Sequence, residues 1–517
     1  MLYPVLRWVA GVALDWFYAG VEVAGAERVP RDAPLLVVAN HPNQLVDALL
    51  VARALGRRVT FTGKAVLMEN PAVAMLGRAV GFVPLRRVQD EARQRAGSPT
   101  GTIARAAGAA GGERDTGSSP DASPVGAPER DRNAAAFAAI VAALGRREAV
   151  LIFPEGISHD RPDLAPIKTG AARIALQARD GGDVRGLHVV AVGLTFERKW
   201  APRSRVLVQV GEPLAVDGWR PAGGGAGGGS AVAELTAEVE RRLRAVTLNF
   251  PTREAADAVL PASRLLAALL EDEVRPLDEP HPPLPGVVEV ARRAELVRRA
   301  IEGEGAPAAA ARERVARFAE RLDRLRAALE GRGVATSEVG VETATVAGVR
   351  FVVREAALVA LGGPVALWGR LNHWAPLALA RAVARRTSRN PEDPAMHTIV
   401  AGLVLVPLFY SVQTGLVWRL AGGWSALAYL VSLPPSARWA LRYADRLAHA
   451  RRRMRACLLF RREPALRREL AGEVAWVRAE AVALADDLAL AGTSSSLSVP
   501  GGTTTDATWS SREQRPA

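Results

Sequence analysis

A chain of 517 residues is too long for one ordinary hydrophobic core, so the sequence predicts two or more structural units. Its single cysteine excludes a disulfide framework and a thiolate metal cluster, and its seven scattered histidines argue against a structural zinc site. The formal net charge of +13 leaves nucleic acid and an anionic membrane as the two obvious partners.

Residues 1–30 are predicted to form an amphipathic N-terminal helix. Asp15 and Glu22 interrupt the apolar region before the candidate cleavage site, which argues against a secretory signal. Trp8 and the aromatic residues at 16–18 are of the kind found at a membrane interface. The alternative is that this helix docks on the rest of the protein.

Residues 31–250 alternate short apolar runs with helical patterns, which predicts an α/β domain with a mixed, largely parallel sheet flanked by helices. Residues 93–132 are rich in small and polar residues without a periodic apolar face, so a disordered insertion is predicted there. Residues 221–230 predict a flexible loop. Strands are expected at 35–39, 59–62, 80–84, 149–153, 188–194 and 205–210, and helices at 45–55, 134–145, 168–179 and 231–247.

The pattern changes after residue 250. Residues 251–350 predict a helical accessory region broken by Pro-rich linkers, and residues 351–460 predict membrane-associated helices. A further helix is expected at 461–491 and a disordered tail at 492–517.

Two uncharged stretches predict a membrane-associated hairpin at about 396–435. Residues 398–418 carry no charge and are long enough to cross a bilayer core of ~30 Å, whereas the uncharged stretch 420–435 is shorter. Arginines flank the pair on both sides, so the positive-inside rule places both flanks on the cytoplasmic face of the cell membrane. The run 356–369 is too short to span and predicts an interfacial or re-entrant piece. The alternative, a very apolar soluble helical core, is disfavoured because 398–418 has no polar stripe.

The apolar helices and the arginines beside them indicate which partner the positive charge attracts. A basic cytoplasmic surface beside apolar helices fits anionic membrane lipid as a partner. The sequence has no recognition-helix, zinc-finger or aromatic RNA-binding motif, so no nucleic-acid partner is expected. Nearly all cations are Arg, and Lys occurs only as Lys64, Lys168 and Lys199.

A His and an Asp stand where the first buried strand meets a helix. His41 follows the apolar run 35–39, at the strand-to-helix crevice where α/β folds bind ligands, and Asp47 lies in the following first helical turn. A carboxylate that accepts a hydrogen bond from one imidazole nitrogen leaves the other nitrogen free as a base. No nucleophilic Ser is near, so the substrate would supply the hydroxyl. Alone, such a pair is more often a helix cap or a surface residue.

Two further polar clusters follow predicted strands. In "GFVPLRR", Arg86 and Arg87 suit a phosphate, which a guanidinium binds through two hydrogen bonds; a solvated charge pair is the alternative. In "AVLIFPEGISHD", Glu155 stands at the end of a buried strand, beside a glycine that permits close backbone approach. Ser158 can bond a phosphate or the loop backbone. Lys168 follows at the entrance to a helix whose N-terminus favours an anion.

The segments "NHPNQLVD", "GFVPLRR", "FPEGIS" and "VVAVGL", in this order, resemble the four sequence blocks of the glycerolphosphate and lysophospholipid acyltransferases. The resemblance covers roughly residues 20–250 and implies an α/β acyltransferase domain with a membrane-bound face. It implies that His41 is the general base and that Asp47 orients it. The residues implied or expected to bind the acceptor are Lys64, Arg86, Arg87, Glu155, Gly156, Ser158 and Lys168.

One departure from the family pattern concerns the catalytic pair. The commoner spacing places four residues between His and Asp, whereas five intervene between His41 and Asp47. One added helical residue would turn the Asp side chain by about 100°, so the extra residue must be absorbed in the non-helical part near Pro42. A subset of glycerolphosphate acyltransferases resembles this longer spacing.

The resemblance implies transfer of a fatty acyl group from an acyl-CoA or acyl carrier protein thioester, with no metal or bound cofactor. The acceptor would be glycerol 3-phosphate or its monoacyl form, lysophosphatidate. The longer spacing and the C-terminal extension favour glycerol 3-phosphate (or dihydroxyacetone phosphate). A non-catalytic lipid-binding protein on the same scaffold is the alternative of another class. A lipid hydrolase is disfavoured because the sequence lacks a G-x-S-x-G motif.

Overall fold

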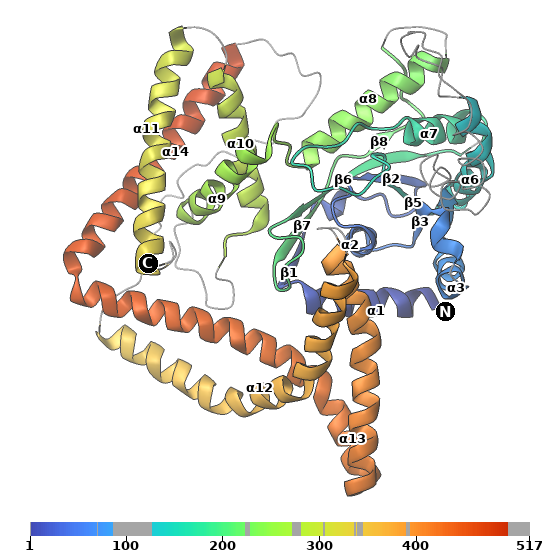
Figure 1. Cartoon of the computed structure of the whole chain (residues 1–517). Coiled ribbons are helices and arrows are strands. Elements are labelled where there is room, and N and C mark those ends of the chain that lie inside the picture. The colour runs from blue at the N-terminus through green and yellow to red at the C-terminus, as the bar shows by residue number, and fades with distance from the viewer. Residues whose placement is uncertain are drawn as a thin grey trace, which may run out of the picture.

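The computed structural model describes residues 2–69, 71–85, 127–182, 184–222, 228–270, 281–302, 306–334, 338, 345–388 and 393–494. Within them an eight-stranded sheet has the order β1-β7-β6-β2-β5-β3-β4, with β8 paired to β6 (Figure 1). All neighbouring strands are parallel except the antiparallel pairs β6–β7 and β6–β8. The prediction of a mixed, largely parallel sheet is confirmed. The strands are β1 Gly20–Ala24, β2 Leu35–Ala39, β3 Val59–Lys64, β4 Val83–Leu85, β5 Ala149–Ile152, β6 His188–Phe196, β7 Arg205–Val210 and β8 Leu214–Ala215.

Helices cover both faces of this sheet. The central strand β2 is buried at every position, and its side chains alternate between two cores. Leu35, Val37 and Ala39 pack with α1 (Leu2–Phe17) and α2 (Leu45–Leu55). Leu36 and Val38 pack on the other face with α6 (Ala127–Gly145), α7 (Gly170–Asp180) and α8 (Gly228–Val246).

Several element bounds differ from the sequence expectation. The N-terminal helix ends at Phe17, and Gly20–Ala24 is an edge strand paired with β7, so residues 1–30 are not one helix. Val80 ends α3 (Pro71–Val80) instead of starting a strand, because Gly81 adopts φ +78° and breaks the helix before β4. Short 3₁₀ turns also occur at η1 (Ala26–Arg28) and η2 (Ala65–Glu69).

The expected insertion and the two flexible segments are only partly described. Residues 127–132 form the first turns of α6, and the remainder of the insertion predicted at 93–132 lies outside the described residues. α8 begins at Gly228, inside the predicted loop, and residues 223–227 lie outside the described residues. The last helix ends at Ser494, and the rest of the tail is likewise outside them.

A second helical unit packs beside the α/β domain (Figure 1). Its core joins leucines of α9 and α11 to Phe460, Leu470 and Val477 from the last two helices. Arg321 of α11 lies 4.0 Å from the ring centroid of Trp476 and pairs with Glu473 at 2.7 Å. The helices are α9 Arg253–Leu269, α10 Leu284–Glu302, α11 Ala306–Arg332 and α14 Pro464–Ser494.

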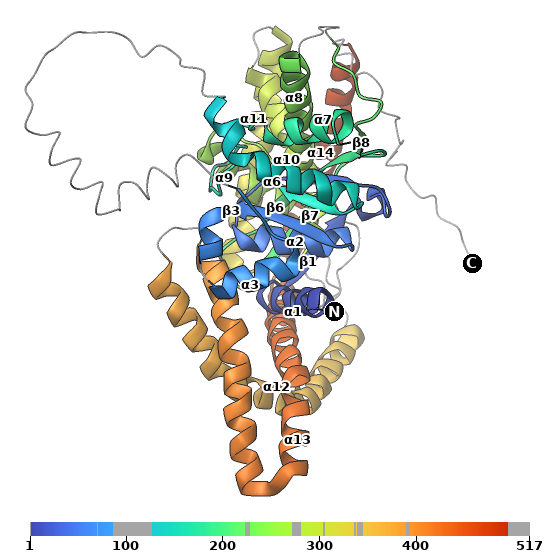
Figure 2. The same ribbon diagram turned by 90° about the vertical axis from the view of Figure 1, so that its right-hand side faces the viewer.

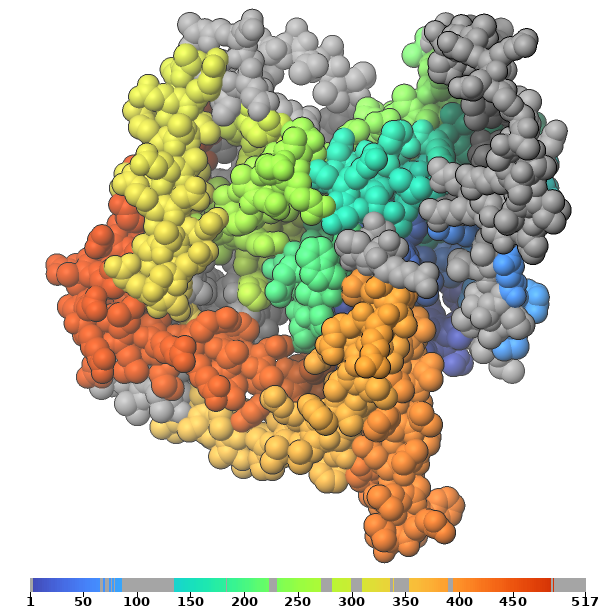
Figure 3. Space-filling view, in the orientation of Figure 1, coloured from blue at the N-terminus to red at the C-terminus, as the bar shows by residue number. Residues whose placement is uncertain are grey.

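Two long helices carry the apolar region. α12 (Thr345–Thr387) is continuous, so residues 356–369 form its middle and not a separate re-entrant piece. α13 (Asp393–Arg462) contains a non-helical residue, Gly422, at φ 80°, ψ 175°, where the chain turns back (Figure 2). The turn lies at the tip of a protrusion that extends from the body of the molecule (Figure 3).

A polar cluster holds α12 against both limbs of α13. The buried His373 donates from Nδ1 to the Gly369 carbonyl at 2.7 Å, and its Nε2 accepts from the Tyr410 hydroxyl at 2.5 Å. On the other limb, the Tyr429 hydroxyl donates to Asn372 Oδ1. Because these bonds satisfy polar groups between otherwise apolar helices, they fix how the three segments pack.

Candidate active site

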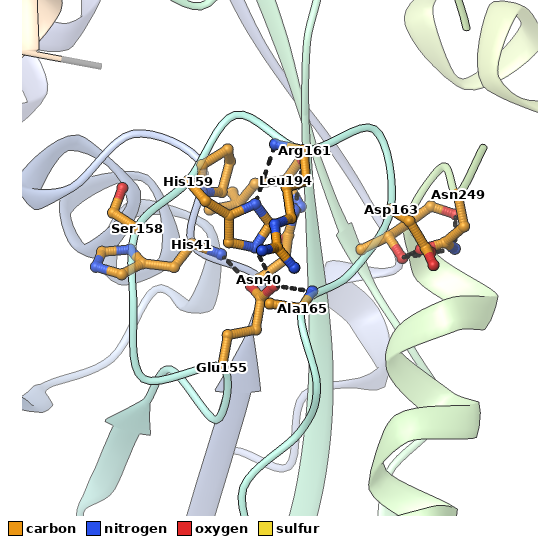
Figure 4. A network of polar contacts seen from close by, with 12 residues as sticks. Asn40, His41, Glu155, Ser158, His159, Arg161, Asp163, Ala165, Leu194 and Asn249 are labelled. Carbon is orange, nitrogen blue, oxygen red and sulfur yellow. Dashed lines mark hydrogen bonds and ion pairs between the residues drawn. The ribbon is translucent and has the colours of Figure 1, made fainter. Parts of the chain in front are cut away.

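The candidate site forms where two parallel strands end side by side. β2 pairs with β5 in parallel register, so the loops that follow them leave the same edge of the sheet. The His41 backbone N–H donates to Glu155 Oε1 at 2.9 Å, and the His159 N–H donates to the His41 carbonyl at 3.2 Å (Figure 4). The first and third sequence blocks therefore form one hydrogen-bonded unit.

His41 and Asp47 form the expected pair. His41 Nδ1 lies 3.0 Å from Asp47 Oδ2, and the Asp47 side chain has no exposed surface, whereas that of His41 is 15% exposed. The Asn43 N–H donates to the same carboxylate oxygen at 2.6 Å. The His41 ring stacks on Phe153, with centroids 3.9 Å apart and planes 14° from parallel. A carboxylate on Nδ1 places the proton there and leaves Nε2 as the acceptor.

The charge state of Asp47 reflects opposing influences. Burial raises the pKa of Asp47, while the hydrogen bond and charge of His41, the Asn43 N–H and the charge of Lys199 lower it. Oδ1 of Asp47 is buried without a hydrogen-bond partner among the described residues. The carboxylate thus depends on its few cationic and N–H neighbours to stay ionised.

The additional residue between His41 and Asp47 is absorbed in a turn outside the helix, as predicted from the sequence. Gln44 has φ 51° and ψ −128°, and the Val46 N–H donates to the Asn43 carbonyl at 3.2 Å. These values match a type II′ turn, whose second residue is usually glycine. A non-glycine residue at this φ carries strain, which is typical of functional sites. The Gln44 N–H also donates to Ser158 Oγ at 3.3 Å.

Glu155 is engaged with the protein at both carboxylate oxygens. Its side chain has no exposed surface, Oε1 accepts from the His41 N–H, and Oε2 accepts from the Ala165 N–H at 2.7 Å. These bonds hold the backbone of the His41 loop at the edge of the sheet. The structure thus gives Glu155 a positioning role, in addition to its place in the lining of the adjacent cavity.

His159 is a site residue that was not predicted from the sequence. Its Nδ1 accepts from the Arg161 N–H at 3.1 Å, so its Nε2–H donates to Glu155 Oε2. His159 and Arg161 line a small cavity behind the His41 backbone, and the His41 ring points to the other side (Figure 4). The position of His159, directly after the third block "FPEGIS", was the available sequence signal.

Some of the predicted acceptor-binding residues are described by the structure, and two of them are not. Gly156 adopts φ +72°, and a Cβ there would lie 2.7 Å from Lys168 Nζ, so glycine lets the ammonium approach the loop. Lys64 ends β3 and is in register with Leu85, the last residue of β4. Arg86 and Arg87 follow directly in sequence and lie outside the described residues.

Among the described residues, no group of three or more His, Cys, Asp or Glu side chains is placed to hold a metal ion. The site instead offers an imidazole braced by a buried carboxylate, with the Lys168 ammonium beside Gly156 on the loop after β5. Such an arrangement can remove a proton from a hydroxyl that is held by an anionic group.

The His41–Asp47 dyad lies at the carboxyl edge of the sheet in the α/β domain. Residues 20–195 match the family model described as Acyltransferase. This match and the relatives described next confirm the resemblance of the four sequence blocks to the glycerolphosphate and lysophospholipid acyltransferases.

Three curated relatives are similar to parts of the chain. An uncharacterized acyltransferase of Schizosaccharomyces pombe is 28% identical over 42% of this chain and 39% of its own length. Glycerol-3-phosphate O-acyltransferase 2 of Saccharomyces cerevisiae is 34% identical over 32% of this chain and 21% of its own length. Glycerol-3-phosphate O-acyltransferase 1 of the same yeast is 24% identical over 57% of this chain and 44% of its own length. The chain thus spans less than half of each of these relatives.

A solved structure is also similar to part of the chain. It is the crystal structure of a 1-acyl-sn-glycerophosphate acyltransferase from Thermotoga maritima, with a TM-score of 0.30 and 19% sequence identity. The match covers 47% of this chain and 78% of that chain.

Proposed function

We propose that this protein is a membrane-bound O-acyltransferase of phospholipid biosynthesis. It transfers a fatty acyl group from an acyl-CoA or acyl carrier protein thioester to glycerol 3-phosphate. The Acyltransferase family model that matches residues 20–195 and the activity named for the two Saccharomyces cerevisiae relatives support this assignment. The observation that carries it is the 3.0 Å contact between His41 Nδ1 and the fully buried Asp47 carboxylate.

The proposed chemistry begins with proton transfer to His41. Nε2 takes the proton of the acceptor hydroxyl as its oxygen attacks the thioester carbonyl, and a C–O bond forms. The tetrahedral intermediate then collapses, the C–S bond breaks, and the leaving thiolate receives a proton from the imidazolium. Asp47 holds the tautomer and stabilises the transient positive charge. Such base catalysis contributes about 10²–10⁴-fold to the rate.

The acceptor phosphate would be bound by cations at the same edge of the sheet. Arg87, with Arg86 beside it, is the proposed anchor. Lys64 and Lys168 are proposed to supply compact ammonium groups, because this chain uses Arg almost everywhere else. Gly156 and Ser158 would shape the loop that faces the phosphate. Full activity in the variants Lys64→Arg and Lys168→Arg would remove support for the special role of these lysines.

We further propose that α13 inserts into the membrane as a hairpin about residues 396–435, from the cytoplasmic face. Of the described helices, the part of α13 from Pro394 to Arg462 is the one that is long and apolar enough to cross a bilayer. Only 22% of its most apolar 18-residue segment is buried, whereas the core helix of a soluble protein is mostly buried. At its tip Trp418 and Trp424 are 66% and 86% exposed.

The position of α1 supports the proposal that α1 and α13 face the membrane on the same side of the molecule. It lies along the side of the α/β domain from which α13 projects (Figure 2). Its exposed residues include Trp8 at 69% and Val5 at 54%. An apolar helix face next to the hairpin would rest on the lipid surface. Anionic lipid would be attracted by the arginines that follow the hairpin, Arg438, Arg442 and Arg451 among them.

The acceptor is tested with the purified full chain in phospholipid vesicles. Glycerol 3-phosphate, dihydroxyacetone phosphate and lysophosphatidate are offered separately with a fixed acyl-CoA, and mass spectrometry identifies the product. We expect the fastest transfer to glycerol 3-phosphate. A clear preference for lysophosphatidate would overturn the assignment of the acceptor, and thioester cleavage without any acylated product would overturn acyl transfer itself.

A further inference from the structure

Lys199 is the one lysine to which neither the sequence motifs nor the proposed chemistry assigns a role. It lies in the loop between β6 and β7, and its side chain is only 7% exposed. Lysines are almost never this buried unless they are paired. In a chain with three lysines, a buried one that contacts Pro42 and Asp160, next to the site histidines, calls for a physical reason.

The Lys199 ammonium joins the two loops of the active site. Nζ donates to the Pro42 carbonyl at 3.1 Å and pairs with Asp160 Oδ1 at 2.7 Å. Pro42 directly follows His41, and Asp160 directly follows His159. A single cation therefore fixes the loop of the first block against the loop of the third block.

The Lys199 backbone is linked to Asp47, the other member of the dyad, through Asn43. Its carbonyl accepts from Asn43 Nδ2 at 3.2 Å and from the Tyr18 hydroxyl at 3.5 Å. Asn43 is itself buried, and its N–H donates to Asp47. Tyr18 directly follows α1, the helix with an exposed apolar face, and its hydroxyl accepts from Asn43 Nδ2 at 3.0 Å. Lys199 thus supports His41 through Pro42 and Asp47 through Asn43.

We propose that Lys199 is a positioning residue for the acyl transfer reaction, holding the His41–Asp47 dyad in its working geometry and charge state. The inference deepens the proposed function and depends on it for the reaction. A compact ammonium suits this enclosed place better than a planar guanidinium.

The charged and titratable groups around Lys199 set the sign of its electrostatic effect. Asp160 faces it from the third-block loop, and Arg253 of α9 pairs with the same carboxylate at 2.9 Å. Asp47 lies on α2, and Tyr18 directly follows α1. The charge of Lys199 lowers the pKa of Asp47, so its removal favours protonation of the dyad at higher pH.

The test compares Lys199→Met, which removes the charge, with Lys199→Arg, which keeps it. Arg241→Met is the matched control, because it removes a cation from an exposed ion pair with Glu238 on α8. We expect K199M to lower kcat by about 10²-fold with little change in KM for the acceptor. The acidic limb of its pH–rate profile should move to higher pH, whereas K199R and R241M should keep the limb of the wild type.

A second readout does not depend on activity. Diethyl pyrocarbonate modifies neutral imidazole, and peptide mass spectrometry follows its reaction with His41 as a function of pH. The midpoint should rise in K199M. It should fall in Asp160→Asn, which leaves the Lys199 charge uncompensated and serves if K199M does not fold. An unchanged midpoint in the folded variants would overturn the inference, whatever happens to kcat. Absence of acyl transfer by the wild type would instead overturn the proposed function, and the modification profile would still test Lys199.

Discussion

Replacement of Asp47 by Asn separates the chemistry of the site from its stability. In the wild type, one oxygen of Asp47 accepts from both His41 Nδ1 and the Asn43 N–H. In D47N an amide oxygen in the place of Oδ2 can keep both bonds, whereas an NH₂ there would face the Asn43 N–H donor. The imidazole then keeps its proton on Nδ1, but the neutral amide no longer stabilises the imidazolium that forms when Nε2 takes the proton of the acceptor. We expect kcat to fall by about 10²–10⁴-fold, the range that general-base catalysis supplies.

The thermal stability of D47N should be equal to or higher than that of the wild type, although its activity falls. Burial raises the pKa of Asp47 in the folded state above its value in the unfolded chain. The folded state therefore favours the protonated form, and this contribution to stability is lost as the pH rises through the folded-state pKa. At neutral pH the wild type holds a desolvated carboxylate, whereas the D47N variant holds a neutral amide. We expect D47N to unfold at a temperature equal to or above that of the wild type at pH 7, with a smaller difference at low pH.

The assay measures acyl transfer and thermal unfolding on the same preparations. The conservative variant Asp47→Glu keeps the charge and serves as the control for ionisation. D47N with more than about a tenth of wild-type kcat would refute the proposed role of the Asp47 charge. A large drop in unfolding temperature at pH 7 would show that Asp47 is a structural anchor.

Further predictions concern the turn, the loop and the anchor. Gln44→Gly should be more stable to denaturant than Gln44→Ala by about 1 kcal/mol, because both lack the side chain and only Ala keeps the strain of φ 51°; equal midpoints in urea would contradict this. Glu155→Gln should lower the free energy of unfolding by about 1–3 kcal/mol, because one buried N–H loses its acceptor, and a urea titration matching the wild type would argue against it. Deletion of residues 396–435 should move the protein from the membrane pellet to the soluble fraction, and continued sedimentation with membranes would place the anchor elsewhere.

Elements with strong local patterns could be predicted from the sequence. The bounds of β2, α2 and β7 match the expectation, because each is an apolar run or a helical pattern that ends at polar or glycine residues. The strand β1 could not be distinguished from a helix, since the five residues "GVEVA" contain a charged residue and gain their strand only by pairing with β7, far along the chain. The end of α3 at Val80 could not be predicted from the sequence either, because the helix is broken by the positive φ of Gly81.

The same distinction applies to the site. The pairing of His41 with Asp47 follows from local spacing, and the structure confirms that the two side chains meet. The roles of Glu155 and Lys199 depend on contacts between segments more than 100 residues apart, with sequence separations of 114 and 157. Periodicity and composition carry no information on such contacts. Arg86 and Arg87 remain predicted phosphate ligands, since they lie outside the described residues.

The central claim is that the imidazole of His41 activates the acceptor hydroxyl. The most direct measurement is the rate of free thiol release from acyl-CoA, in the presence of glycerol 3-phosphate, by the wild type and by His41→Ala. We predict release that requires the acceptor and that falls by about 10²–10⁴-fold in the variant, at equal amounts of folded protein. Identical rates for the two proteins would contradict this claim and would favour a lipid-binding protein on an acyltransferase scaffold.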